Sequence, residues 1–179
     1  NVAFALCEGE IAGIRRVWAD GREIDREAIE IRVYNGSEDQ LPDPLIEAKQ
    51  GIGHAPAYRG TAYVVIEHFA LADYGNRVPQ LQFEVLRPVG DLRQRIKAVS
   101  LIPGATEYGL APGAVTQVKR LGETENINRH VLHARSDLVA ALDELQMICP
   151  NLEHVALVAT WFGDDLRAGN CRIRPAVTT

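Results

Sequence analysis

The stretch Ala72–Val85 reads ADYGNRVPQLQFEV and joins a turn to an alternating segment. From Gln80 to Val85, polar and apolar residues alternate, which is the period of a strand with one buried face. Gly75 and Asn76 both tolerate the backbone of a tight turn. The stretch therefore predicts a turn followed by a half-buried strand, and we find no catalytic motif in it.

The segments before this stretch also predict β-structure. The motif Asp20-Gly21 is a strong two-residue hairpin signal, and a β-branched, aromatic run precedes the opening turn. Two helical turns are expected at PLIEAKQ, which a proline opens and Gly51 ends. The strands expected here are residues 2–7, both arms of the hairpin 14–24, residues 29–34 and residues 61–69.

The second half of the chain predicts an α+β arrangement. Its clearest helix covers about residues 137–149, with Ser136 as N-cap and Pro150 as terminator. Asp91 is the expected N-cap of a short helix over residues 92–97. Strands are expected in residues 98–104, 115–121, 154–163 and 170–177, the third of them buried. We therefore expect a β-rich α+β fold with two subdomains: mostly antiparallel β over residues 1–88, and α+β over residues 89–179.

Composition narrows the possible functions. The 179 residues carry a formal net charge of −5, which disfavours a general nucleic-acid binder because such proteins need a basic surface. No apolar run approaches the roughly 18 residues of a membrane helix. Three widely spaced cysteines do not suggest a disulfide framework, and the sequence implies no cofactor or metal. The chain opens on Asn1 within a strand-like segment, from which we infer a piece of a longer polypeptide.

A few side chains are candidates for chemistry. Asp164-Asp165 is the best acid pair, but a Gly-Asp-Asp loop is more typical of a turn. A glycosidase would need one of these carboxylates about 5 to 9.5 Å from a partner such as Glu107. His130 and His133 have the spacing of one helical face but no evident third ligand. Trp161 and Phe162 could stack on a sugar, although a core position is the expectation. We therefore predict no catalytic, cofactor-binding or metal-binding residue.

The sequence as a whole resembles the hub proteins of long-tailed bacteriophages. The resemblance lies in ALCEGEIAGIRRVWADGREI and in PAYRGTAYVVIEHFALADYGNRVPQLQFEV. LIPGATEYG and CPNLEHVALVATWFGDDLRAGNCRIRP are similar to the large tail-tip protein of gene transfer agents, in which these segments lie close to a glycoside-hydrolase-like TIM barrel. The matching positions in the first half are Cys7, Glu8, Gly9, Ile11, Gly13, Trp18, Asp20, Gly21, Tyr58, Arg59, Gly60, Ala62, Tyr63, Glu67, Tyr74, Gly75, Asn76, Arg77, Pro79, Phe83, Glu84 and Val85.

This resemblance implies a structural role in a phage or gene-transfer-agent tail tip, in the virion, after assembly in the bacterial cytoplasm. It implies a baseplate hub domain related to tail-tube proteins that closes the tube and supports DNA delivery. The implied partners are further copies in a ring, usually a trimer, the distal tail and tail-tube proteins, DNA passing through the lumen and, indirectly, the cell envelope. The polar face of Gln80, Gln82 and Glu84 would face a neighbour or the lumen. The alternative is part of a peptidoglycan-cleaving glycoside hydrolase. A barrel needs about 250 residues, so no enzyme activity is expected of this chain.

Overall fold

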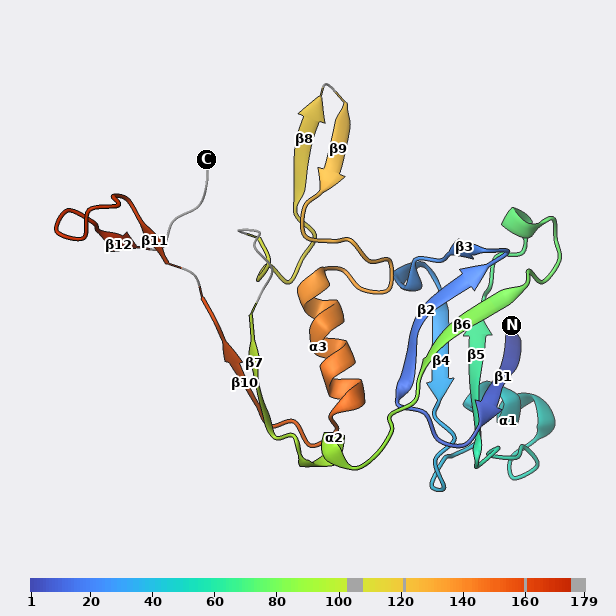
Figure 1. Cartoon of the computed structure of the whole chain (residues 1–179). Helices are drawn as coiled ribbons and strands as arrows, with labels where there is room; N and C mark the ends of the chain where they lie inside the picture. Colours follow the sequence, from blue (N-terminus) through green and yellow to red (C-terminus); the bar gives the residue numbers. More distant parts are fainter. Residues whose placement is uncertain (103–107, 121, 160, 175–179) are drawn as a thin grey trace.

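The computed structural model describes residues 1–102, 108–120, 122–159 and 161–174 (Figure 1). The chain is β-rich with few helices, which confirms the predicted fold class. The helices are α1 (Pro44–Gln50), α2 (Leu92–Arg95) and α3 (Asp137–Ile148), with 3₁₀ turns at Arg26–Ala28 and Ala72–Tyr74. The strands are β1 (Val2–Glu8), β2 (Gly13–Ala19), β3 (Arg22–Glu23), β4 (Glu30–Tyr34), β5 (Thr61–Glu67), β6 (Leu81–Leu86), β7 (Ala98–Leu101), β8 (Thr116–Arg120), β9 (Glu123–Asn126), β10 (His154–Leu157), β11 (Phe162–Gly163) and β12 (Ile173–Arg174).

The first sheet has the antiparallel order β1-β5-β4. Its central strand β5 is buried on both faces, which explains why its sequence reads as a continuous apolar run and not as an alternation. On one face, Ala62 and Val64 enter the core. On the other, Tyr63 stacks on Tyr34 with ring centroids 4.3 Å apart. β5 is therefore the central strand of this sheet and contributes side chains to the packing on both of its faces.

The second sheet has the order β3-β2-β6, also antiparallel. The predicted hairpin joins β2 to β3 through Asp20 and Gly21, both of which have positive φ, as this tight turn requires. The end of the stretch Ala72–Val85 provides most of β6, which pairs with β2. A bulge interrupts this pairing between Ile14 and Val17.

The two sheets enclose the main hydrophobic core. Ile14 and Val17 of the second sheet pack against Val64 of the first, and each is at most 1% exposed. Phe4 and Phe83 close one side of the core with their rings tilted and 6.1 Å apart. Complete burial of each such aliphatic side chain contributes about 1.5 to 3 kcal/mol to stability.

Helix α3 packs beside β2 (Figure 1). Ser136 caps it by accepting a hydrogen bond from the Val139 N–H at 3.3 Å, as predicted. A Cβ added to Gly13 would lie 2.6 Å from Met147 Sδ, so the glycine allows the helix to approach the strand closely. None of the helices in the described part of the chain has the length and apolar character that crossing a bilayer requires.

Strands β7 and β10 form a parallel pair, and α3 lies between them in the chain. The expectation of a buried strand over residues 154–163 was wrong. β10 stops at Leu157 and all four of its residues are exposed, and no third strand joins the β7–β10 pair in the described part of the chain. Trp161 is 60% exposed and therefore does not fill a core.

Two smaller expectations also need correction. α2 ends at Arg95, and the Asp91 side chain makes no capping hydrogen bond, since its backbone is already helical instead of extended. The three cysteines are free, but only Cys149 is buried, whereas Cys7 and Cys171 are half-buried.

The β8–β9 hairpin and the β11–β12 hairpin extend away from the body of the molecule (Figure 1). Every strand residue of β8 and β9 is exposed. A two-stranded hairpin is only marginally stable in water by itself. In the described chain, these two hairpins therefore gain little stability from packing against other elements.

Candidate functional site

The loop before β6 forms hydrogen bonds with the turn between β2 and β3. Arg77 Nη2 donates to the Asp20 carboxylate at 2.7 Å, and the Gln80 N–H donates to the same carboxylate at 2.9 Å. In return, the Asp20 N–H donates to the Gln80 carbonyl at 3.0 Å. The Arg77 guanidinium and the Gln80 N–H, which both donate to the carboxylate, hold the pKa of Asp20 below its usual range. The loop thus holds the start of β6 beside the end of β2.

The polar face of β6 is mixed. Gln80 and Gln82 are exposed, but Glu84 is half-buried in a cluster of charges. Arg15 Nη2 and Arg16 Nε donate to Glu84 at 2.7 and 2.9 Å. The bulge in β2 breaks the alternation of side chains, so that two successive arginines reach one carboxylate. Arg15 Nη1 also donates to Glu144 of α3 at 2.9 Å. Glu84 therefore links β6, β2 and the helix and is not a free negative charge.

We expect Glu84→Gln to lower the free energy of unfolding by about 1 to 2 kcal/mol at neutral pH, because one amide cannot replace two charge-assisted contacts. The hydrogen bonds from Arg15 and Arg16 hold the pKa of Glu84 far below its usual value. The contribution is therefore complete above about pH 4.3 and is lost as the pH falls further. Urea unfolding at several pH values measures it. Glu38→Gln, an exposed carboxylate, is the control, and an equal effect of the two changes at pH 7 would contradict the prediction.

The acid pair Asp164-Asp165 forms part of a turn. Arg167 Nη2 donates to Asp165 at 2.7 Å and lowers the pKa of that carboxyl. Asp164 accepts a hydrogen bond from the Arg172 N–H at 2.8 Å. Both carboxylates thus stabilise the β11–β12 connection. The proposed acidic partner Glu107 lies outside the described residues.

The two histidines at helical spacing lie outside α3 and do not form a metal site within the described residues. His130 is exposed, and its Nδ1 lies 2.7 Å from a carboxylate oxygen of Asp137, beside the start of the helix. His133 Nδ1 is buried without a hydrogen-bond partner among the residues that the structure describes, and burial lowers the pKa of this imidazole. His130 thus has a structural role, as a partner of the first residue of α3.

A third group of candidate ligands was missed by the sequence analysis. Glu30, Glu67 and His68 bring their ligand atoms within 4.8 Å of one another. Pairing of β4 with β5 places the two glutamates opposite each other, although they are far apart in the sequence. Arg32 pairs with Glu67, and His68 Nδ1 lies 3.1 Å from Glu30. Each ligand thus already has a partner in the protein, and these contacts account for the cluster without a metal.

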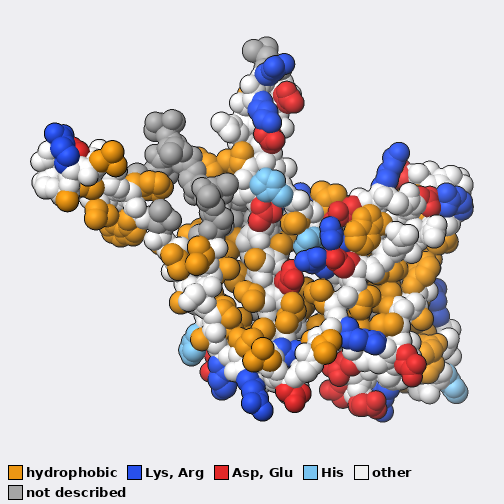
Figure 2. Space-filling model, in the orientation of Figure 1, with side chains coloured by type: hydrophobic (Ala, Val, Ile, Leu, Met, Phe, Trp, Pro, Cys, Tyr) orange, Lys and Arg blue, Asp and Glu red, His pale blue; other side chains and the backbone are white. Residues whose placement is uncertain are grey.

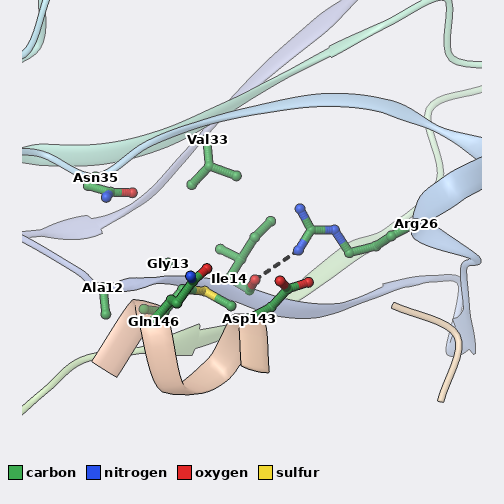
Figure 3. A pocket seen from close by; sticks show the side chains of 9 residues that line it. Ala12, Gly13, Ile14, Arg26, Val33, Asn35, Asp143 and Gln146 are labelled. Atoms are coloured by element: carbon green, nitrogen blue, oxygen red, sulfur yellow. Dashed lines mark hydrogen bonds between the residues drawn. The ribbon is translucent and has the colours of Figure 1, made fainter. Parts of the chain in front are cut away.

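A cavity of about 450 Å³ lies between β2, β4 and α3 (Figure 3). Arg26 and Asn35 lie at opposite ends of it, with Asp143 of α3 beside the guanidinium. Arg26 Nη1 donates to the Ile14 carbonyl at 2.9 Å. Burial lowers the pKa of Arg26, and the charge of Asp143 acts in the opposite direction. The floor of the cavity is apolar and its two ends are polar.

A second cavity, of about 420 Å³, adjoins the first. It extends toward α2, where Arg93 and Gln94 line it together with Glu10. The Nε atom of Arg93 is buried and has no hydrogen-bond partner in the described part of the chain. The two cavities share four lining residues, Ala12, Asn35, Gln146 and Met147. Together they form one groove along the C-terminal half of α3, which we call the α3 groove.

Comparison with solved structures finds a related chain in a particle described as "Virion of native gene transfer agent (GTA) particle". The two chains are 59% identical over 50% of this chain and 21% of the virion chain, and the TM-score is 0.45. The relationship rests on the identity of the residues and not on the superposition. No protein-family model matches the chain, and neither does any curated protein. Half of this chain is thus related to a protein of a gene transfer agent virion.

Proposed function

We propose that this chain is a structural component of the tail tip of a phage-like particle, where it belongs to the baseplate hub that closes the tail tube and supports DNA delivery. The observation that carries the proposal is the 59% identity with a chain of a gene transfer agent virion. The matched region covers only about a fifth of that virion chain, so the place within the particle is part of the proposal.

The exposed apolar surface of the second half supports a role in assembly. Figure 2 shows hydrophobic side chains gathered over the strands that follow α3. Soluble monomeric proteins seldom expose a contiguous apolar surface of this kind, and such a surface usually marks a site that a partner covers. The exposed side chains here are Val155, Leu157, Val158, Trp161, Phe162, Leu166 and Ile173, at 39% exposure or more.

The strand pairing in this region points the same way. Parallel strands occur almost only in sheets whose faces are both covered. In the described chain, β7 and β10 instead form a sheet of two strands, so each strand also has one unpaired edge. Free edges readily accept further strands. We propose that other parts of the assembly cover this pair.

The proposal assigns no catalytic reaction to the chain. Its partners would be further copies in a ring, a trimer by analogy with the hub proteins that the chain resembles, and the adjoining tail proteins. Gln80 and Gln82 would present uncharged amides to a neighbour or to the lumen. Uncharged amides would let DNA pass without strong attraction, since attraction to phosphate depends on cationic groups.

The proposed ring is tested by measuring mass in solution. Two proteins are compared: the product of the complete gene and the 179-residue chain. We expect a discrete oligomer for the complete gene product and weak association or a monomer for the 179-residue chain. Multi-angle light scattering over a range of concentrations measures both masses.

A complete gene product that stays monomeric at every concentration would argue against the hub. Gold-labelled antibodies to this chain, applied to purified particles, separate the tail tip from other virion positions. Label on the capsid alone would leave a virion component but remove the tail-tip role.

A further inference from the structure

The α3 groove contains two guanidinium groups with free hydrogen-bonding capacity. Other half-buried arginines of the described chain have carboxylate partners, as Arg15 has in Glu84 and Arg129 has in Asp25. Arg26 instead makes one side-chain hydrogen bond, to a backbone carbonyl, and no ion pair with a described residue. At the other end of the groove, Arg93 Nε is buried without a partner among the described residues. A guanidinium has five N–H donors, so both groups can bind an additional acceptor.

The other groups in the groove restrict which acceptor fits. Asp143 and Glu10 place negative charge in the lining, which disfavours a phosphate dianion or a nucleic-acid backbone. A single carboxylate at each arginine carries less charge and matches the planar fork of a guanidinium. Asn35 and Gln146 offer amide donors and acceptors between the two arginines, and these suit the peptide bonds of an extended chain.

The shape of the groove favours a peptide over a small acid. The two cavities, of about 450 and 420 Å³, continue into one another past Met147, with one arginine in each. An apolar floor made by Ile14, Val33 and Met147 can receive the apolar side chains of an extended segment. A small carboxylate would fill one end only and leave the other guanidinium without a partner.

We propose that the α3 groove binds an extended peptide segment with acidic side chains, contributed by another protein of the particle. The carboxylates of the segment pair with Arg26 and Arg93, and its peptide bonds meet the amides between them. The source of the segment rests on the proposed function, whereas the binding site itself rests on the groove alone. This contact would join helix α3 to a neighbour on the side away from the exposed strands β7 and β10.

Fluorescence anisotropy with labelled peptides tests the site. The probe is a short peptide of alternating threonine and valine that carries two glutamates, and its control has glutamine in both places. We expect the glutamine peptide to bind at least about tenfold more weakly, because hydrogen bonds to charged groups are lost. Equal binding of the two peptides, or binding of neither at millimolar concentration, would overturn the proposal.

Variants of α2 separate the groove from general charge attraction. Arg93→Met should weaken the glutamate peptide about tenfold, whereas Arg95→Met, the same change at an exposed position of the same helix, should leave it unchanged. Arg26→Met provides a second measurement. The unfolding of this variant is followed separately, because Arg26 also donates a hydrogen bond to the Ile14 carbonyl. Equal weakening by Arg93→Met and Arg95→Met would show nonspecific attraction and reject the site.

Free N-acetylglutamate distinguishes a peptide site from a small-acid site. We expect it to compete only weakly, and competition as strong as that of the peptide would overturn the peptide proposal. None of these results depends on a ring. Loss of peptide binding with an intact oligomer would reject the groove alone, and a monomeric gene product with intact peptide binding would reject the hub alone.

Discussion

Asp43→Ala is expected to lower the free energy of unfolding by about 3 to 5 kcal/mol, because it removes a buried carboxylate that accepts charge-assisted hydrogen bonds and also caps a helix. The Asp43 side chain is fully buried, and its carboxylate accepts hydrogen bonds from Arg32 at 2.8 Å and Tyr34 at 2.7 Å. It also caps α1 by accepting from the Leu45 and Ile46 N–H groups. Removal would leave the Arg32 charge without this partner and the first turn of the helix without its cap. Urea unfolding followed by circular dichroism measures the loss.

Asp91→Ala provides a matched control, because Asp91 also precedes a helix but makes no side-chain capping bond. We expect it to change stability by less than about 0.5 kcal/mol. Burial alone would raise the pKa of Asp43, but hydrogen bonds from Arg32 and Tyr34 hold it below its usual value. Its contribution is therefore present above about pH 3.9 and is lost as the pH falls through the folded-state value. Similar losses from the two variants at pH 7 would show that the buried contacts of Asp43 do not stabilise the fold.

Gly36→Ala should lower the free energy of unfolding by about 2 to 5 kcal/mol. Gly36 has φ +82°, where a side chain is strained, and a Cβ there would lie 2.9 Å from the Ala62 N and 3.1 Å from the Gly9 carbonyl oxygen. Those neighbours are backbone atoms of β5 and of the turn after β1, so they cannot move aside without disturbing the first sheet. Thermal unfolding measures the effect.

Gly60→Ala separates strain from crowding. Gly60 has a similar φ of +75°, but a Cβ there would meet no atom of the described residues within 4 Å. Gly60→Ala should therefore lower the free energy of unfolding only by the strain of a left-handed backbone, about 1 to 2 kcal/mol. The crowding argument fails if Gly36→Ala proves no more destabilising than Gly60→Ala.

The local elements were largely predictable from sequence because short-range chemistry sets them. Asp20-Gly21 specifies a tight turn, Ser136 specifies a helix start, and the alternation after Pro79 specifies β6. The strand predicted over residues 154–163 failed for a reason that is not local. An apolar β-branched run predicts burial only if a covering layer exists, and none covers β10 in the described part of the chain.

The candidate sites depended on distant parts of the chain and were less accessible to sequence reasoning. Neither the contact of Glu144 with Arg15 nor the cluster of Glu30, Glu67 and His68 has a signal in local spacing. The α3 groove likewise combines Arg26, Arg93 and Gln146 from three separate elements.

The sequence by itself determined the fold class, the β2–β3 hairpin, the helix after Ser136 and the resemblance to tail-tip proteins, because turn chemistry, alternation and capping act between residues close in the chain. Only the tertiary structure decided which charges are paired, which apolar strands stay exposed and where two arginines face an open groove. Those outcomes depend on how sheets and α3 pack, and packing joins residues that no local pattern relates.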